Sequence, residues 1–152
     1  MKNLLIATAT LAALAAPAFA EGDIAKGEKA FKKCKSCHMV KADDGTMIMK
    51  GGKTGPNLYG VIGRPFGGVE GFKYGKTLVA AGESGLVWTE ESLAAFVADP
   101  KGYLKEATGD SKAKSKMTFK LKKGGADVAA YLASVGPAPV AEEAETDAAT
   151  DS

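Results

Sequence analysis

The sequence predicts one all-α domain in which short helices are joined by long loops. Apolar residues recur at the three- and four-residue spacing of amphipathic helices, and no segment shows the alternation of a convincing strand. Aromatic residues make up only 7% of the chain, whereas glycine occurs 19 times, so the apolar core is thin for a domain of this length. We therefore expect about four to five short helices wrapped around something other than side chains.

Residues 1–20 have the pattern of a secretory signal peptide. Lys2 precedes an apolar run from Leu4 to about Ala16, and the small-residue cleavage pattern A-F-A follows at positions 18–20. The run is short for a bilayer crossing and ends at small residues and a proline, so a retained membrane anchor is the less favoured alternative. We expect a mature chain that begins near Glu21 and is exported to the periplasm.

The remaining chain divides into a basic domain, residues 21–136, and an acidic tail, residues 137–152. The tail, PAPVAEEAETDAATDS, has five acids and no base, and it cannot bury enough apolar surface to offset the entropy of ordering. It is expected to be disordered. Residues 21–136 contain 19 Lys and Arg against 13 Asp and Glu, a charge of about +6 that the overall +2 conceals. This length suits one compact domain.

The first helix is expected to begin after Asp23, a suitable N-cap, and to run into the cysteine motif. One face at helical spacing carries Ile24, Gly27, Ala30, Phe31 and Cys34. A glycine inside a helix costs about 1 kcal/mol relative to alanine, so Gly27 indicates that another backbone crosses closely at this point. Residues 41–72 then form a glycine-rich loop with turn signals and no period, and a loop of this length usually has a function.

Further helices are expected in the second half of the chain. A short helical patch covers residues 77–81, and Thr89 can cap the next helix, in which Leu93, Phe96 and Val97 face inward. Asp99-Pro100 ends this helix and starts another, because proline suits the first helical position. A polar stretch leads to Met117, and residues 125–135 form the last helix, with apolar positions Val128, Tyr131, Leu132 and Val135.

The segment CKSCH, residues 34–38, contains both cysteines of the chain and its only histidine. C-x-x-C-H is the attachment motif of a c-type haem. Residues i, i+3 and i+4 share a face of a helix, so two thiols can reach the two vinyl groups while an imidazole meets the iron. The motif therefore predicts one covalent haem c, with thioethers at Cys34 and Cys37 and His38 as an axial iron ligand. A haem would also fill the thin core.

Two other sites use a C-x-x-C motif, a thiol-disulfide centre and half of a zinc site. A zinc site needs further ligands, and the chain has no third cysteine or second histidine. A thioredoxin-like centre needs a βαβ setting, which the helical pattern does not offer. Haem is the favoured interpretation.

The second axial position is expected to hold a methionine sulfur or to be open, since His38 is the only histidine. Met39 directly follows His38 and cannot reach the opposite face of a haem. Met47 and Met49 lie in the loop after the motif and are more suited to apolar cover. Met117 lies far along the chain in an irregular stretch, so it is the predicted ligand.

These motifs together resemble the class I c-type cytochromes, the group of mitochondrial cytochrome c and the soluble bacterial cytochromes c2. The resemblance covers residues 22–136, and its anchors stand in the order found in that family. They are Gly27 and Phe31, CKSCH, GPNLYG at 55–60, GR at 63–64, GFKY at 71–74, Trp88, Pro100, Tyr103, KM at 116–117 and Tyr131.

The resemblance implies the cytochrome c fold and a set of haem contacts. The Pro56 carbonyl would accept from the His38 ring, and a haem propionate would be held by Arg64, Tyr74 and Trp88. Gly27 and Phe31 would pack against the last helix near Val128 and Tyr131. The chain departs from the short mitochondrial type by extra residues in three loops, by its tail, and by Phe96 at a position that is often tyrosine in the family.

An iron with His and Met ligands has no open position, so the sequence predicts an electron carrier and not an enzyme. Lysines flank both ligand motifs: Lys32, Lys33, Lys35, Lys112, Lys114, Lys116, Lys120, Lys122 and Lys123. A basic rim of this kind would steer encounters with acidic docking sites. We expect a monomer that carries electrons from a membrane quinol-cytochrome c oxidoreductase to a terminal oxidase or a photosynthetic reaction centre, without binding nucleic acid.

The main alternative is a gas-binding or peroxidase-like haem protein with His38 alone on the iron. The position of the motif at the front of the chain, and the presence of only one such motif, disfavour it. A haem-free thiol oxidoreductase is the third alternative. A separate hypothesis is that the acids of the tail fold back over the basic rim and tune docking.

Overall fold

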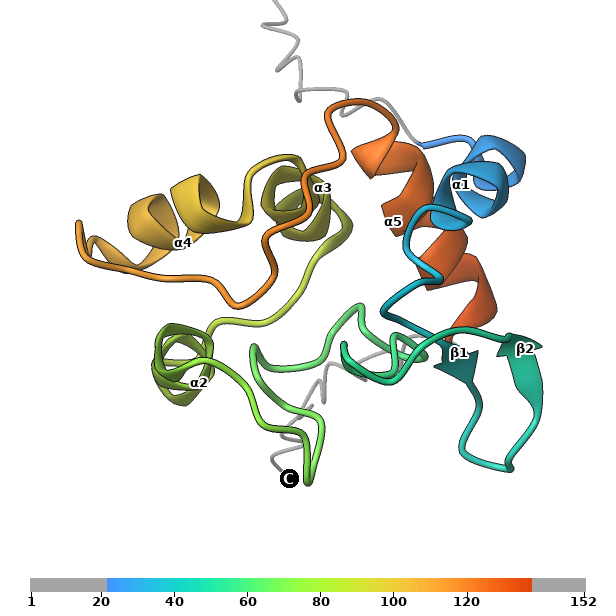
Figure 1. The fold of residues 1–152 in the computed structure, drawn as a ribbon, viewed down its shortest axis with the longest axis horizontal. Helices are drawn as coiled ribbons and strands as arrows, with labels where there is room; N and C mark the ends of the chain where they lie inside the picture. The colour runs from blue at the N-terminus through green and yellow to red at the C-terminus, as the bar shows by residue number, and fades with distance from the viewer. Residues whose placement is uncertain (1–21, 138–152) are drawn as a thin grey trace, which may run out of the picture.

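The structure, a computed structural model, describes residues 22–137, which form five helices and one short hairpin (Figure 1). The helices are α1 (Ile24–Phe31), α2 (Lys76–Glu83), α3 (Glu90–Ala98), α4 (Pro100–Thr108) and α5 (Gly125–Val135), and the strands are β1 (Val40–Lys41) and β2 (Met47–Met49). The predicted all-α fold of short helices and long loops is confirmed. The expected signal peptide and residues 138–152 of the expected tail lie outside the described residues. Within residues 22–137, no helix has the length and apolar character needed to cross a membrane.

The helix starts follow the predicted caps. The Asp23 carboxylate accepts from the Lys26 N–H at 2.9 Å at the start of α1. At α3, Thr89 Oγ1 accepts from the Ser92 N–H at 3.0 Å while Ser92 Oγ accepts from the Thr89 N–H at 2.8 Å, a reciprocal capping box. Asp99 ends α3 and caps α4, with Pro100 at the first helical position.

Helix α1 packs against α5, and this contact explains the glycine inside α1 (Figure 1). A Cβ added to Gly27 would overlap the carbonyl oxygen of Asp127 and lie 2.7 Å from Cβ of Tyr131. Phe31 is completely buried, and its ring centroid lies 5.7 Å from that of Tyr131. The predicted packing of Gly27 and Phe31 on the last helix is confirmed.

Gly27→Ala should therefore lower the free energy of unfolding by about 3 kcal/mol, because the two helix backbones must separate to admit the methyl group. Guanidinium unfolding of the holoprotein measures the change. Glu28→Ala, at an exposed neighbouring position of the same helix, should change stability by less than about 0.5 kcal/mol. A Gly27→Ala variant as stable as the parent would show that α1 and α5 are not in close backbone contact.

The cysteine motif follows α1 as a turn and not as a continuation of the helix, which corrects one expectation. Helix α1 ends at Phe31, and residues 32–37 form consecutive turns. The His38 N–H still bonds the Cys34 carbonyl at 2.9 Å, so one helical turn is kept between these two residues. This single turn preserves the spacing on which the motif depends.

The expectation of no strand is wrong at one place, where β1 and β2 pair antiparallel within residues 40–49. The turn between them contains Gly45, whose φ of 91° suits glycine, and the Asp44 carboxylate accepts from the Thr46 N–H at 2.8 Å. The Asn57 amide donates to the Lys41 carbonyl at 2.7 Å and accepts from the Lys41 N–H at 3.0 Å. A distant side chain thus completes the hydrogen bonding of the outer edge of β1.

A second part of the core is aromatic. Trp88 stacks on Phe66 with ring centroids 3.7 Å apart and meets Phe96 edge-on at 5.0 Å. Helix α3 also packs on α5, so Leu93 and Val97 are buried as predicted. The α1, α5 and α3 scaffold and this aromatic cluster hold the loops that form the site.

Candidate haem site

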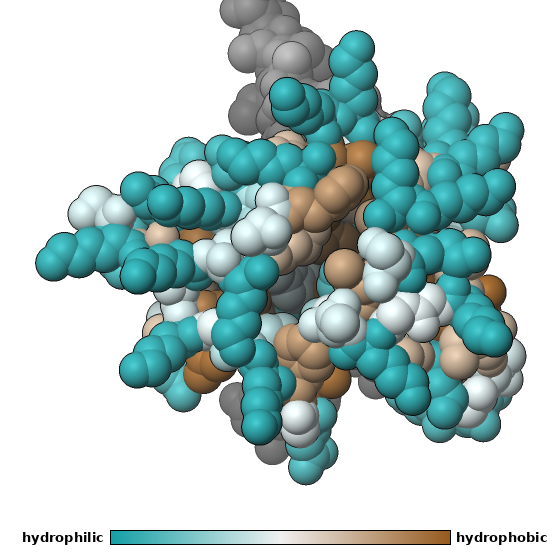
Figure 2. All heavy atoms as spheres, viewed as in Figure 1, coloured by the Kyte–Doolittle hydropathy of each residue, from teal (hydrophilic) through white to brown (hydrophobic). Residues whose placement is uncertain are grey.

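A cavity of about 450 Å³ lies at the centre of the fold. On the face of the molecule that Figure 2 shows, hydrophobic side chains surround a hollow in the middle, and hydrophilic side chains cover the surrounding surface. The inner lining includes Leu93, Phe96 and Val97 of α3 and Val128 and Leu132 of α5. Its size lies within the range of about 300–1,000 Å³ that is usual for cofactor sites.

The cavity brings together all of the side chains that the sequence singled out for haem. They are Cys34, Cys37, His38, Pro56, Arg64, Tyr74, Trp88 and Met117. These residues come from separate loops and turns, and only the fold places them around one space.

His38 is held in one orientation by its neighbours. Only 9% of its surface is exposed, and ring Nδ1 lies 2.8 Å from the Pro56 carbonyl oxygen. A carbonyl can only accept, so Nδ1 carries the hydrogen and Nε2 keeps its lone pair. Burial lowers the pKa of His38, while the bond to Pro56 acts in the opposite direction. The side chain is therefore suited to be a neutral imidazole ligand.

Gly55 makes room for the His38 ring. A Cβ at this position would lie 2.6 Å from Nδ1 and 2.7 Å from Nε2, closer than van der Waals contact allows. The Gly55 N–H also donates to the Cys37 carbonyl at 2.8 Å. Gly55 of the segment GPN thus packs against the imidazole, and the Pro56 carbonyl fixes the ring orientation by its hydrogen bond to Nδ1.

The two cysteines lie in different environments. Burial raises the pKa of Cys34 to about 11, with a smaller contribution from Cys37 and an opposing one from Lys33. Cys37 is exposed, and hydrogen bonds from Thr54 and Ser36 lower its pKa. Cys34 therefore lies within the apolar interior and Cys37 at its edge.

Met117 is the one methionine of residues 22–137 that lines the cavity. Met47 lies on the hairpin with 46% of its surface exposed, and Met49 packs on the core away from the cavity. Phe96, at the position that is often tyrosine in the family, also lines the cavity. A phenylalanine has no hydroxyl that could donate a hydrogen bond to the Met117 sulfur.

Arg64, Tyr74 and Trp88 bring polar groups to the otherwise apolar lining. The Arg64 guanidinium donates to the Asn57 carbonyl at 3.0 Å and to the Tyr59 carbonyl, and desolvation lowers its pKa. A guanidinium has five N–H donors, so it retains capacity for a carboxylate. Burial raises the pKa of Tyr74, and Trp88 is buried beside Phe66. Such donors are what a partly buried carboxylate requires.

The basic rim differs in part from the predicted set. Lys33, Lys114 and Lys116 line the cavity as expected, and Lys73 lines it as well. The other predicted lysines do not: Lys32, Lys35, Lys112, Lys120, Lys122 and Lys123. Lys73 was not among the predicted rim lysines because that prediction included only lysines close in sequence to the CKSCH motif or to Met117. Its place in GFKY, beside Tyr74, was the available signal.

The residues present fit a haem. A largely apolar cavity contains one neutral imidazole, one thioether and two cysteine side chains, with a group of polar donors and the rim lysines around it. In this arrangement Cys34 and Cys37 can hold the vinyl carbons, and His38 and Met117 can hold the iron.

Comparison with protein-family models gives no match. Among curated proteins, the chain is 56% identical over 154 residues to cytochrome c-550 of Paracoccus versutus, with 99% of this chain and 100% of that protein covered. It is 61% identical over 133 residues to cytochrome c2 of Rhodobacter capsulatus, with 88% and 96% covered. The chain belongs to the class I c-type cytochromes. It carries one covalently bound haem c and is an electron carrier, not an enzyme.

Solved structures agree with this assignment. The crystal structure of the Rhodobacter capsulatus cytochrome c2 has a TM-score of 0.74 at 62% identity, covering 75% of this chain and 98% of that one. Ferric cytochrome c-550 from Paracoccus versutus has a TM-score of 0.74 at 61% identity, covering 77% and 100%. The cytochrome c fold expected from the motifs is confirmed.

Proposed function

We propose that this cytochrome is a soluble periplasmic carrier of single electrons with a closed iron. Cys34 and Cys37 form the thioethers, and His38 and Met117 are the axial ligands. The observation that carries the proposal is the meeting of His38 and Met117 in one apolar cavity, since they come from segments far apart in the sequence. The signal-peptide pattern of residues 1–20 supports the periplasmic location.

The protein groups around His38 are suited to a site for electron transfer. The Pro56 carbonyl fixes the His38 tautomer, and Gly55 fixes the ring position. When bound, the haem supplies a one-electron couple between ferric and ferrous iron. The apolar lining and the thioether of Met117 both favour the ferrous state, so we expect a high potential. With both axial positions filled, no substrate can reach the metal.

Arg64, Tyr74 and Trp88 are proposed to hold a haem propionate. Two observations support this role: all three residues line the cavity, and Arg64 and Tyr74 are partly buried. A carboxylate placed beside a half-buried guanidinium is stabilised by both charge and hydrogen bonding. The bonds from Arg64 to Asn57 and Tyr59 hold the guanidinium in place for this contact.

The rim lysines, Lys33, Lys73, Lys114 and Lys116, are proposed to dock acidic partners. They surround the cavity that holds the haem, so a partner attracted to them approaches the redox centre. Partners of this chemistry are a quinol-cytochrome c oxidoreductase as donor and a terminal oxidase or photosynthetic reaction centre as acceptor. A monomer in a respiratory or photosynthetic chain would shuttle between them.

Charge reversal of two rim lysines tests this docking surface. Lys33→Glu with Lys114→Glu should lower the bimolecular rate of electron transfer to a cytochrome c oxidase on the order of tenfold at low ionic strength, and raising the salt should reduce the difference. Stopped-flow kinetics over a salt series measures both effects.

The matched control is Lys50→Glu with Lys101→Glu, which makes the same change in net charge at exposed positions outside the cavity lining. It should retain most of the parental rate. Equal losses in the two double variants, or rates that do not depend on ionic strength, would refute docking through the rim lysines.

A further inference from the structure

The wall of the haem cavity carries positive charge and no negative charge of its own. The described residues that line it include Arg64 and the four rim lysines, and no aspartate or glutamate. All four rim lysines are exposed. Within residues 22–137, none of them lies within ion-pair distance of a carboxylate. The folded domain therefore presents unpaired positive charge around its redox centre.

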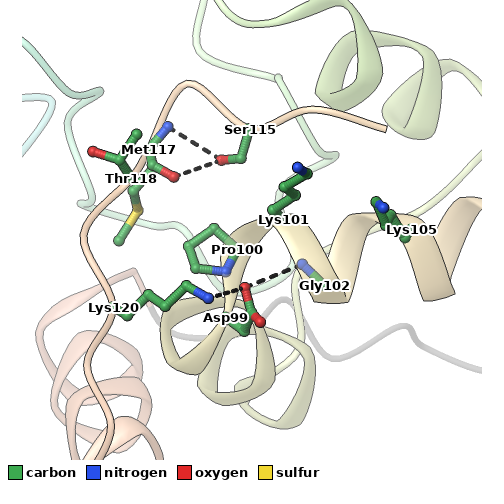
Figure 3. A pocket seen from close by; sticks show the side chains of 9 residues that line it. All are labelled: Asp99, Pro100, Lys101, Gly102, Lys105, Ser115, Met117, Thr118 and Lys120. Carbon is green, nitrogen blue, oxygen red and sulfur yellow. Dashed lines mark hydrogen bonds and ion pairs between the residues drawn. The ribbon is translucent and has the colours of Figure 1, made fainter. Parts of the chain in front are cut away.

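A second basic feature, the groove beside Met117, differs from the rim in this respect. The groove has a volume of about 430 Å³ and is bordered by Lys101, Lys105 and Lys120 (Figure 3). The Lys120 ammonium is paired with the Asp99 carboxylate at 2.9 Å, as the same figure shows. Part of the positive charge of the groove is thus neutralised within the folded domain. Acids that neutralise the rim must come from outside residues 22–137.

The acidic tail carries such acids. All of its charged residues lie beyond Pro137, outside the described residues, and the tail contains no base. The number of these acids is close to the number of rim lysines, so the tail and the rim are complementary in charge. The five acids are Glu142, Glu143, Glu145, Asp147 and Asp151.

The last described residues lie beside the wall of the haem cavity. A Cβ added to Gly60 would lie 3.2 Å from Cδ of Pro137 and 3.8 Å from Nη2 of Arg64. Arg64 in turn lines the cavity. Residues 138–152 therefore start from a point next to the cavity lining.

The tail is long enough to reach the rim from this point. Glu142 is five residues beyond Pro137, a reach of at most about 17 Å, and Asp151 is fourteen residues beyond it, at most about 50 Å. A folded domain of this length has a radius of gyration of about 13 Å, so the whole rim lies within range. A tethered segment acts at an effective concentration on the order of 1 mM, at which even a weak attraction has an effect.

We propose that the acidic tail binds the rim lysines of its own chain and competes with acidic partners for them. A partner must displace the tail before it docks, so the tail slows encounter with weakly acidic surfaces more than with strongly acidic ones. Because the contact is between charges, salt weakens it. The proposal rests on the docking role of the rim lysines under the proposed function, and it adds a regulator of that docking.

Carbodiimide crosslinking of the holoprotein with its tail tests the contact directly. The reagent joins a carboxylate to an ammonium that touches it, and mass spectrometry of the digested protein identifies the pair. Crosslinks within one chain, from the tail to the rim lysines, are expected at low ionic strength and should be lost in about 1 M salt. Tail crosslinks mainly to Lys101 or Lys105 of the groove would overturn the proposal. Crosslinks that join an isotope-labelled chain to an unlabelled one would overturn it as well, because they assign the contact to a second copy.

Truncation after Pro137 tests the competition. It should raise the bimolecular rate of electron transfer to a cytochrome c oxidase about threefold at low ionic strength, and the gain should disappear at high salt. Truncation also makes the net charge more positive, so it is repeated in two backgrounds of equal charge. In Lys33→Glu with Lys114→Glu the gain should fall below about 1.3-fold, whereas in Lys50→Glu with Lys101→Glu it should stay near threefold.

Equal gains in the two backgrounds would overturn the competition, because net charge alone would then explain them. An unchanged rate on truncation of the parent would also overturn it. If charge reversal of the rim leaves the rate of the tailed protein unchanged, docking through the rim lysines fails, and the competition fails with it. The crosslinks report the tail contact without any partner, so the two measurements separate failure of the proposed function from failure of the contact.

Discussion

Met117→Ala should lower the midpoint potential by on the order of 0.1 V and open the iron to carbon monoxide. The thioether favours ferrous iron, and no other methionine of residues 22–137 lines the cavity to replace it. The ferrous variant should bind carbon monoxide rapidly, and the charge-transfer band of a methionine-ligated ferric iron should be absent. Potentiometry and visible spectroscopy measure these changes.

Met49→Ala is the control for this variant. Met49 is half-buried and packs on the core, but it does not line the cavity. Its loss should cost about 1 kcal/mol of unfolding free energy and leave spectrum and potential unchanged. If Met117→Ala kept a closed iron at the parental potential, the assignment of Met117 would be wrong.

Gly55→Ala should destabilise the holoprotein by about 3 kcal/mol and disturb the iron ligation of His38. The added methyl group would overlap the imidazole, within 2.7 Å of both ring nitrogens. To relieve the overlap, the ring must rotate or the GPN backbone must move, and either change breaks the bond from Nδ1 to Pro56. Guanidinium unfolding and the fraction of low-spin ferric haem measure the effect.

Lys53→Ala serves as the control, because this exposed residue lies in the same loop two positions earlier. It should alter stability by less than about 0.5 kcal/mol. A Gly55→Ala protein with parental stability and a parental low-spin spectrum would show that the imidazole is not packed against residue 55.

Local signals predicted the helices well. Caps at Asp23, Thr89 and Asp99 are decided by residues within one turn, so α1, α3 and α4 begin where the sequence indicates. The hairpin was missed because its second half has little polar alternation and its outer edge is completed by Asn57, 16 residues away from Lys41. Strand pairing of this kind depends on distant partners.

The residues of the site were predicted from the ligand chemistry of their side chains, and not from where a fold would place them. The CKSCH motif and the small number of methionines limited the choices before any fold was available. No sequence pattern indicates that Arg64 also donates to two carbonyls or that a groove lies beside Met117. These features arise from the packing of loops, for which periodicity carries no information.

The most direct test of a closed electron carrier is the visible spectrum of the mature holoprotein before and after carbon monoxide is added to the reduced form. Low-spin spectra in both oxidation states, a methionine-iron charge-transfer band in the ferric form and no change with carbon monoxide are expected. Rapid formation of a carbon monoxide complex by the parent protein would contradict the closed iron and indicate gas binding or catalysis.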